Sequence, residues 1–165
     1  MMLAALLLAG ASSAADPVCA APASPTEPWT NWNQSSAATA GTQSPGTPAL
    51  LLGNPVTAGL TPGDHVHFAA APGRGGKDGY GGLFALSLQQ AARVGIALSD
   101  AAWVDVVTET QAAESNGHGH GPECSGIRKI VWFDLPAGRH IVQIAGAKAQ
   151  TIRVMATVAK AKQPL

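Results

Sequence analysis

The segment from Asn116 to Cys124 holds the side chains best suited to chemistry. It reads Asn-Gly-His-Gly-His-Gly-Pro-Glu-Cys, which places His118 and His120 close to a carboxylate and a thiol. These groups are metal ligands, and imidazole nitrogen suits zinc and copper. The glycines would let the loop wrap around an ion. The segment therefore predicts a copper or zinc site, although glycine-flanked histidines are also typical of solvated loops.

A second pair of histidines could complete that site. In His65-Val66-His67-Phe68 polar and apolar residues alternate, which predicts a strand with both histidines on one face. If the loop around His118 and His120 folds over that face, the four histidines form one metal site. This is the first functional hypothesis, a periplasmic metal-handling role.

The two cysteines, Cys19 and Cys124, offer another interpretation of the same loop. In an oxidising compartment an even number of cysteines predicts a disulfide. A bond between them would close a loop of about 100 residues and stabilise the fold by about 4 kcal/mol in the loop-entropy model. We expect Cys124 to be bonded to Cys19 rather than to a metal.

Catalysis has less support. Ser125, His120 and Asp105 provide the residue types of a small hydrolase. Ser125, however, lies in Cys-Ser-Gly, without the strand–turn–helix pattern that presents a nucleophile. The residues therefore favour a non-enzymatic protein, with a hydrolase as a remote alternative.

Two tryptophans suggest a different ligand. Trp103 and Trp132 lie on predicted strands, where such residues are usually part of the core. They could instead face outward with Asp105 and Asp134 and form a platform on which sugars stack. The second functional hypothesis is accordingly a module that binds a glycan or another protein through the sandwich face.

The elements that would position these residues are short strands. Apolar and polar residues alternate with a period of two in several segments, and Gly- or Pro-containing turns separate them. About eight such segments at a spacing of roughly 10 residues predict an all-β fold, an antiparallel β-sandwich of jelly-roll type. The clearest segments are residues 84–88, 94–98, 103–108, 130–135, 141–145 and 151–158.

The chain divides into four regions. Residues 1–15 have the short apolar run and small residues of a signal peptide, and the run is too short to span a bilayer. Residues 16–47 are rich in Ala, Ser, Thr and Pro, which predicts an extended arm; Trp29 and Trp32 within it either pack on the domain or remain exposed. Residues 48–160 form the sandwich domain, and 161–165 a polar tail.

Charge narrows the choice of partners. The 165 residues carry a formal net charge of +0, and 12% of them are charged. Neither a basic nor an acidic excess is present, so we expect no nucleic-acid partner. A metal ion, a glycan or another exported protein remain as partners.

Half of the chain also resembles a known family. The motifs Phe84–Leu88, Ala91–Leu98, Trp103–Val107 and Phe133–His140 are similar to those of bacterial pre-peptidase C-terminal domains. The resemblance implies a secreted, jelly-roll-like, non-catalytic unit of the kind that accompanies exported enzymes. Together these observations predict a periplasmic or secreted binding module.

Overall fold

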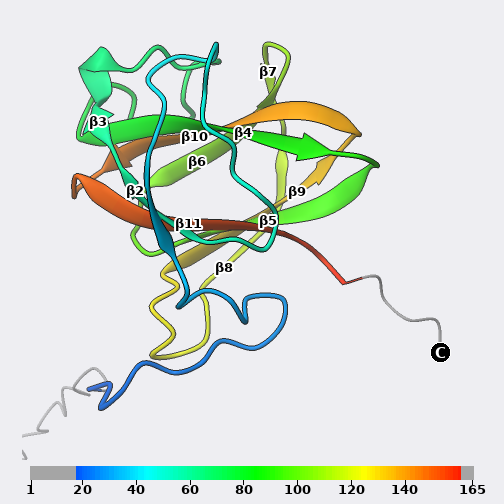
Figure 1. The fold of residues 1–165 in the computed structure, drawn as a ribbon. Helices are drawn as coiled ribbons and strands as arrows, with labels where there is room; N and C mark the ends of the chain where they lie inside the picture. The colour runs from blue at the N-terminus through cyan, green and yellow to red at the C-terminus, as the bar shows by residue number, and fades with distance from the viewer. Residues whose placement is uncertain (1–17, 161–165) are drawn as a thin grey trace, which may run out of the picture.

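Strands with one apolar face must bury that face against another layer, and this requirement sets the architecture. The structure is a computed structural model that describes residues 18–160. Two sheets pack face to face as a sandwich (Figure 1). The predicted signal peptide, residues 1–15, and the tail, residues 161–165, lie outside the described residues.

One sheet has six strands and the other five. The six-stranded sheet has the order β1-β2-β11-β5-β9-β8, and the five-stranded sheet has the order β3-β4-β10-β6-β7. The elements are β1 (Ser36–Thr39), β2 (Val56–Gly59), β3 (Thr61–Pro62), a short 3-10 helix η1 (Gly63–His65), β4 (Tyr80–Leu88), β5 (Ala92–Leu98), β6 (Trp103–Thr108), β7 (Gln111–Ala112), β8 (Ser115–Gly119), β9 (Lys129–Leu135), β10 (Gly138–Ala147) and β11 (Thr151–Val158).

The main strands from β2 onward alternate between the two sheets along the chain. β2, β5, β9 and β11 belong to the six-stranded sheet, whereas β4, β6 and β10 belong to the five-stranded sheet. The named strands pair antiparallel except β1 with β2. The prediction of an all-β antiparallel sandwich is confirmed, and this alternation of strands between two sheets is that of a jelly roll.

The period-two pattern correctly identifies the buried faces. Val131, Phe133 and Leu135 of β9 point into the core between the sheets, while Trp132 belongs to a separate cluster on the outer face. Alternation along a strand sends successive side chains to opposite faces. The outer faces are also partly apolar, so another part of the chain must pack against the outer face of each sheet.

The N-terminal arm covers the outer face of the six-stranded sheet. Trp29 and Trp32 are buried there with Ile130 and Met155. Figure 1 shows the arm, in blue, below the layer that contains β11 and β5. Within the segment 16–47, for which the sequence predicts an extended arm, Ser36–Thr39 forms β1 and pairs with β2. A four-residue edge strand is too short to give a clear period.

The disulfide between Cys19 and Cys124 is confirmed, with the two Cα atoms 5.5 Å apart. A backbone hydrogen bond of 2.8 Å from Ala23 N to Cys124 O continues the attachment. The bond therefore fastens the arm to the loop between β8 and β9, and Cys124 is not available as a metal ligand.

The segment around His65 is not a strand, contrary to the sequence-based expectation. His65 ends η1, and the chain after it lies across the outer face of the five-stranded sheet. Val66 and Phe68 pack there against Leu83 and Ile141. The apolar residues alternate because they cover a sheet, without being part of one.

We predict that Trp32→Ala destabilises the protein by about 3–5 kcal/mol, because it removes a fully buried indole and leaves a cavity. Trp32 is 0% exposed. Leu51→Ala is the control: this side chain is 60% exposed, so the change should be within about 0.5 kcal/mol. Denaturant unfolding would measure both; equal values would contradict the role of the arm.

Candidate binding cleft

The segment between β6 and β9 forms one open edge of the sandwich. Residues 109–126 are rich in polar residues and glycine, but β7 and β8 lie within this segment. β7 extends the five-stranded sheet and β8 the six-stranded sheet. Residues 113 and 114 connect the two strands, and so connect the two sheets at this edge. Glycine and asparagine are uncommon in strands, so residue propensities do not predict a strand over Ser115–Gly119.

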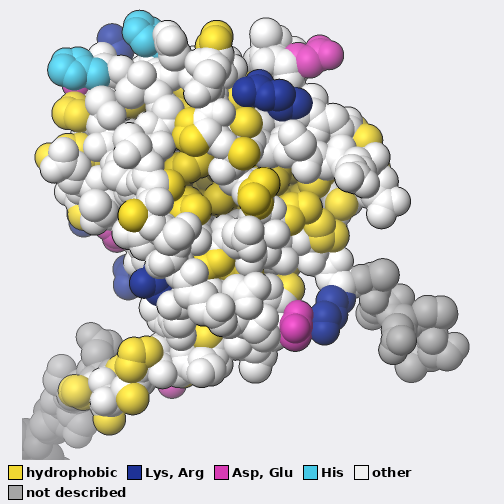
Figure 2. Space-filling model, in the orientation of Figure 1, with side chains coloured by type: hydrophobic (Ala, Val, Ile, Leu, Met, Phe, Trp, Pro, Cys, Tyr) yellow, Lys and Arg dark blue, Asp and Glu magenta, His cyan; other side chains and the backbone are white. Residues whose placement is uncertain are grey.

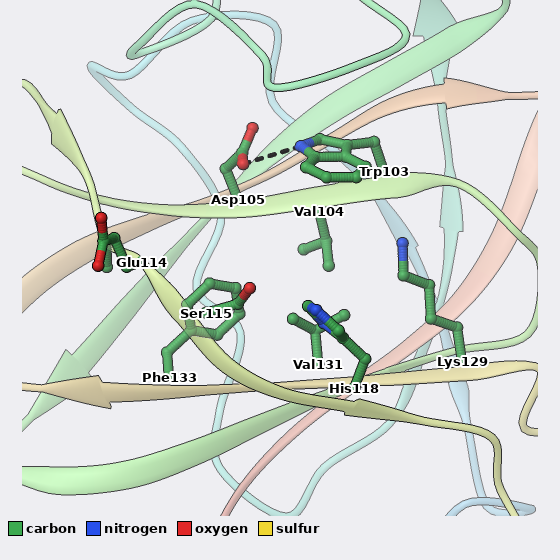
Figure 3. A pocket seen from close by; sticks show the side chains of 10 residues that line it. Trp103, Val104, Asp105, Glu114, Ser115, His118, Lys129, Val131 and Phe133 are labelled. Atoms are coloured by element: carbon green, nitrogen blue, oxygen red, sulfur yellow. Dashed lines mark hydrogen bonds between the residues drawn. The ribbon is translucent and has the colours of Figure 1, made fainter.

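A cleft of about 350 Å³ opens at this edge, between β6 on one side and β8 and β9 on the other. We call it the edge cleft (Figure 3). Its back wall is apolar and its rim carries polar and ionisable groups. The lining residues are Trp103, Val104, Asp105, Ala113, Glu114, Ser115, His118, Lys129, Val131 and Phe133.

Asp105 is the most tightly held group of the cleft. Its carboxylate accepts hydrogen bonds from Trp103 Nε1 at 2.8 Å, Gly73 N at 3.1 Å and Gln143 Nε2 at 3.3 Å. Gln143 faces it directly across the β6–β10 pair. These donors compensate the burial of a carboxylate that is only 8% exposed. Asp105 therefore fixes the orientation of the Trp103 ring at the cleft.

Gly73 contributes to this arrangement because it has no side chain. A Cβ at this position would lie 2.7 Å from the Trp103 ring. The loop can therefore approach the indole closely enough for Gly73 N to reach Asp105. The sequence predicts only a flexible glycine-rich loop here, and no local signal connects it to Asp105.

Lys129 lies at the start of β9 and points toward Trp103 (Figure 3). Its ammonium donates a hydrogen bond of 3.1 Å to Ala102 O and lies 5.0 Å from the centre of the Trp103 ring. Burial lowers the pKa of Lys129, Asp105 opposes this shift and Arg74 adds to it. The sequence analysis did not select Lys129 as a site residue.

His118 is the one predicted metal ligand that lies in the edge cleft. Its ring points toward the centre of the cleft from β8 (Figure 3). Glu114 and Ser115, from the same segment, complete the polar rim. The rim therefore offers an imidazole, a carboxylate, a hydroxyl and an ammonium around one opening.

The four predicted histidines do not come together. His65 and His67 lie beside β3, at the edge of the five-stranded sheet opposite to β7. His118 and His120 lie at the β8 edge and line one shallow recess with Arg128 and Lys129. Within residues 18–160 no group of three or more His, Cys, Asp or Glu side chains is placed to hold a metal ion.

The three residues considered for a hydrolase have separate partners. Ser125 Oγ donates to Pro122 O at 2.6 Å, and His120 Nδ1 contacts Arg128 O at 2.8 Å. Asp105 is bonded to Trp103, as described above. The hydrogen bonds that a catalytic triad requires are therefore made to other groups.

The sugar-stacking platform does not form either. Trp103 and Trp132 face outward, as the alternation predicts, but they belong to different sheets. Arg74 and Lys129 lie over the Trp103 ring, and Arg93 lies over Trp132. A sugar ring could not stack on these aromatic faces without displacing the cations.

The surface agrees with the low charge of the sequence. Figure 2 shows one face on which hydrophobic side chains gather in the middle and charged side chains lie scattered around them. In the part of the chain that the structure describes, no helix is long and apolar enough to cross a membrane.

Comparison with models of protein families and with curated proteins finds no match to this chain.

We predict that Arg74→Gln raises the pKa of Lys129, because it removes a cation that opposes protonation. Asp105→Asn should lower the same pKa further, because it removes the carboxylate that favours the ammonium form. NMR titration of ¹³C-labelled lysine would follow the group, with the exposed Lys148 as internal reference. Equal shifts in the two variants would contradict the assigned contacts.

Proposed function

We propose that this protein is a non-enzymatic binding module that holds a small polar ligand of the sugar class in the edge cleft. The observation that carries the proposal is the lining of the cleft. Glu114, Ser115, His118 and Lys129 surround an opening whose back wall is formed by Val104 and its apolar neighbours. Clefts with apolar walls and a few convergent polar groups are typical binding sites.

The combination of groups favours a neutral ligand with many hydroxyls. Glu114 accepts hydrogen bonds, Lys129 donates them, and His118 and Ser115 can do either. Opposite charges on the rim leave little net attraction for an anion or a cation. A pyranose has hydroxyl groups around its edge and an apolar C–H face, and so matches both the rim and the wall.

Export of the chain is part of the proposal. The Cys19–Cys124 disulfide fits an oxidising compartment. The apolar residues 3–9 and the small residues after them resemble a signal peptide. A periplasmic or secreted location would also expose the module to free sugars and glycans.

A panel of neutral mono- and disaccharides, titrated into the oxidised protein and followed by ¹H–¹⁵N NMR, tests the proposal. We expect shifts centred on β8 and on Lys129. His118→Ala and Glu114→Ala should each weaken binding by up to about tenfold, because each removes one hydrogen bond worth roughly 1 kcal/mol.

His67→Ala is the matched control, since His67 is an exposed histidine at the other edge of the fold. It should bind the same sugars with unchanged affinity. Absence of shifts across the panel would refute the sugar class, and shifts that are unaffected by the His118 and Glu114 substitutions would refute the cleft.

One observation favours a second candidate, a transition-metal site at His118 and His120. Both histidines line the same recess. His120 Nδ1 contacts Arg128 O at 2.8 Å. The other ring nitrogen, Nε2, is therefore the one that could bind a metal. The cations Arg128 and Lys129 in that recess oppose metal binding.

Titration with copper(II) or zinc(II) would decide this candidate. Binding of about one ion per chain that is lost in both His118→Ala and His120→Ala would support a two-histidine site. Binding that is equally weakened by His65→Ala, or no stoichiometric binding, would rule it out. Sugar binding by the cleft is measured separately and does not depend on this result.

A further inference from the structure

Arg153 lies on the outer face of the six-stranded sheet, away from the edge cleft. Its guanidinium lies over the Trp32 ring, with Cζ 5.5 Å from the ring centre. Its Nη1 donates to Trp32 O at 3.3 Å and to Asn33 Oδ1 at 3.5 Å. Nη1 therefore makes both hydrogen bonds to the N-terminal arm, and neither bond uses Nε or Nη2.

Two N–H groups at this place are buried and have no acceptor among residues 18–160. They are Nε of Arg153 and the indole Nε1 of Trp32. A buried donor normally has a partner, because burial removes its hydrogen bonds to water. Nε also belongs to the Nε–Nη2 edge, the edge through which arginine can bind an oxyanion with two parallel hydrogen bonds.

The positive charge of Arg153 is not balanced by a carboxylate. Among residues 18–160 the ion pairs are His65–Asp64 and Lys160–Glu27. Two recesses of about 670 and 330 Å³ share Arg153 and Gly126, and no acidic residue lines either of them. Arg93 also lies over a tryptophan, and its backbone position in β5 is opposite that of Asp134 in β9.

Hydroxyl groups surround the guanidinium in the smaller recess, which we call the Arg153 recess. Thr57 faces Arg153 directly across the β2–β11 pair, and Thr151 lies two residues earlier on the same face of β11. Ser99 Oγ accepts a hydrogen bond of 2.9 Å from Arg153 N, so its O–H remains free to donate. Hydroxyl donors beside an arginine suit a tetrahedral oxyanion.

Gly126 lies next to the buried indole N–H of Trp32. A Cβ at Gly126 would lie 3.6 Å from Trp32 Nε1, and Gly126 also lines the Arg153 recess. Its φ of 75° is in the left-handed region that favours glycine.

We propose that the Arg153 recess is a binding site for a phosphate or sulfate group, either as the inorganic ion or as the monoester of a small molecule. Arg153 supplies the charge and two hydrogen bonds, and Ser99 and Thr151 supply further donors. The site is separate from the edge cleft and does not depend on the sugar hypothesis.

NMR titration of the oxidised full chain with inorganic phosphate, inorganic sulfate and methyl phosphate tests this proposal. We expect saturable shifts of the Trp32 indole N–H and the Arg153 Nε–H signals, at constant ionic strength set with chloride. Tighter binding of methyl phosphate would identify the ester as the ligand class, and tighter binding of inorganic phosphate or sulfate the free ion.

Arg153→Gln should weaken binding at least tenfold, and Arg153→Lys severalfold because it keeps the charge and loses the planar fork. Arg93→Gln is the matched control, which removes the same charge from the same sheet and should change the affinity less than twofold. Ser99→Ala with Thr151→Val keeps the contacts of Arg153 with the arm and should weaken binding severalfold.

Three results would overturn the proposal. The first is the absence of saturable shifts at Trp32 and Arg153 with all three anions. The second is an equal response to chloride at the same ionic strength, which would mean charge screening. The third is an equal loss of affinity in Arg93→Gln and Arg153→Gln while both variants remain folded.

Discussion

Each sheet of this protein is apolar on both faces, and the rest of the structure depends on that constraint. The inner faces are buried against each other, with Phe84 and Phe133 in the shared core. The outer faces cannot remain open, because exposed apolar surface is unfavourable in water. The N-terminal arm with Trp32 covers one of them, and the segment around Val66 covers the other. The disulfide at Cys19 then holds the first cover in place.

The covers also determine where ligands can bind. The outer faces of both sheets are covered by other segments of the chain. A ligand must therefore bind at an edge of the sandwich or beside one of these covering segments. The edge cleft lies between β6 and β8, and the Arg153 recess lies beside the contact of Arg153 with Trp32 and Asn33 of the arm. Asp105 has three donors within the protein, whereas the Nε of Arg153 has no acceptor.

Local alternation was sufficient to predict the central strands and their buried faces. Val104 and Val106 point inward and Trp103 outward, as the period of two requires. Edge strands escaped prediction, because β8 is glycine-rich and β1 has only four residues. The disulfide was predictable from the number of cysteines. The assembly of the cleft was not, because Gly73, Asp105 and Gln143 meet only through the order of strands and the path of a loop.

The histidines illustrate the same limit. Their spacing suggested a shared metal site, but in a jelly roll sequence spacing does not determine which edge a segment occupies. His65 follows β3 at one edge, and His118 lies in β8 at the other. Residue types therefore indicated which groups could bind a ligand, and topology determined which of them meet. Of the four histidines, topology leaves His118 beside Lys129, where an imidazole and an ammonium are better suited to the hydroxyls of a neutral ligand than to a cation.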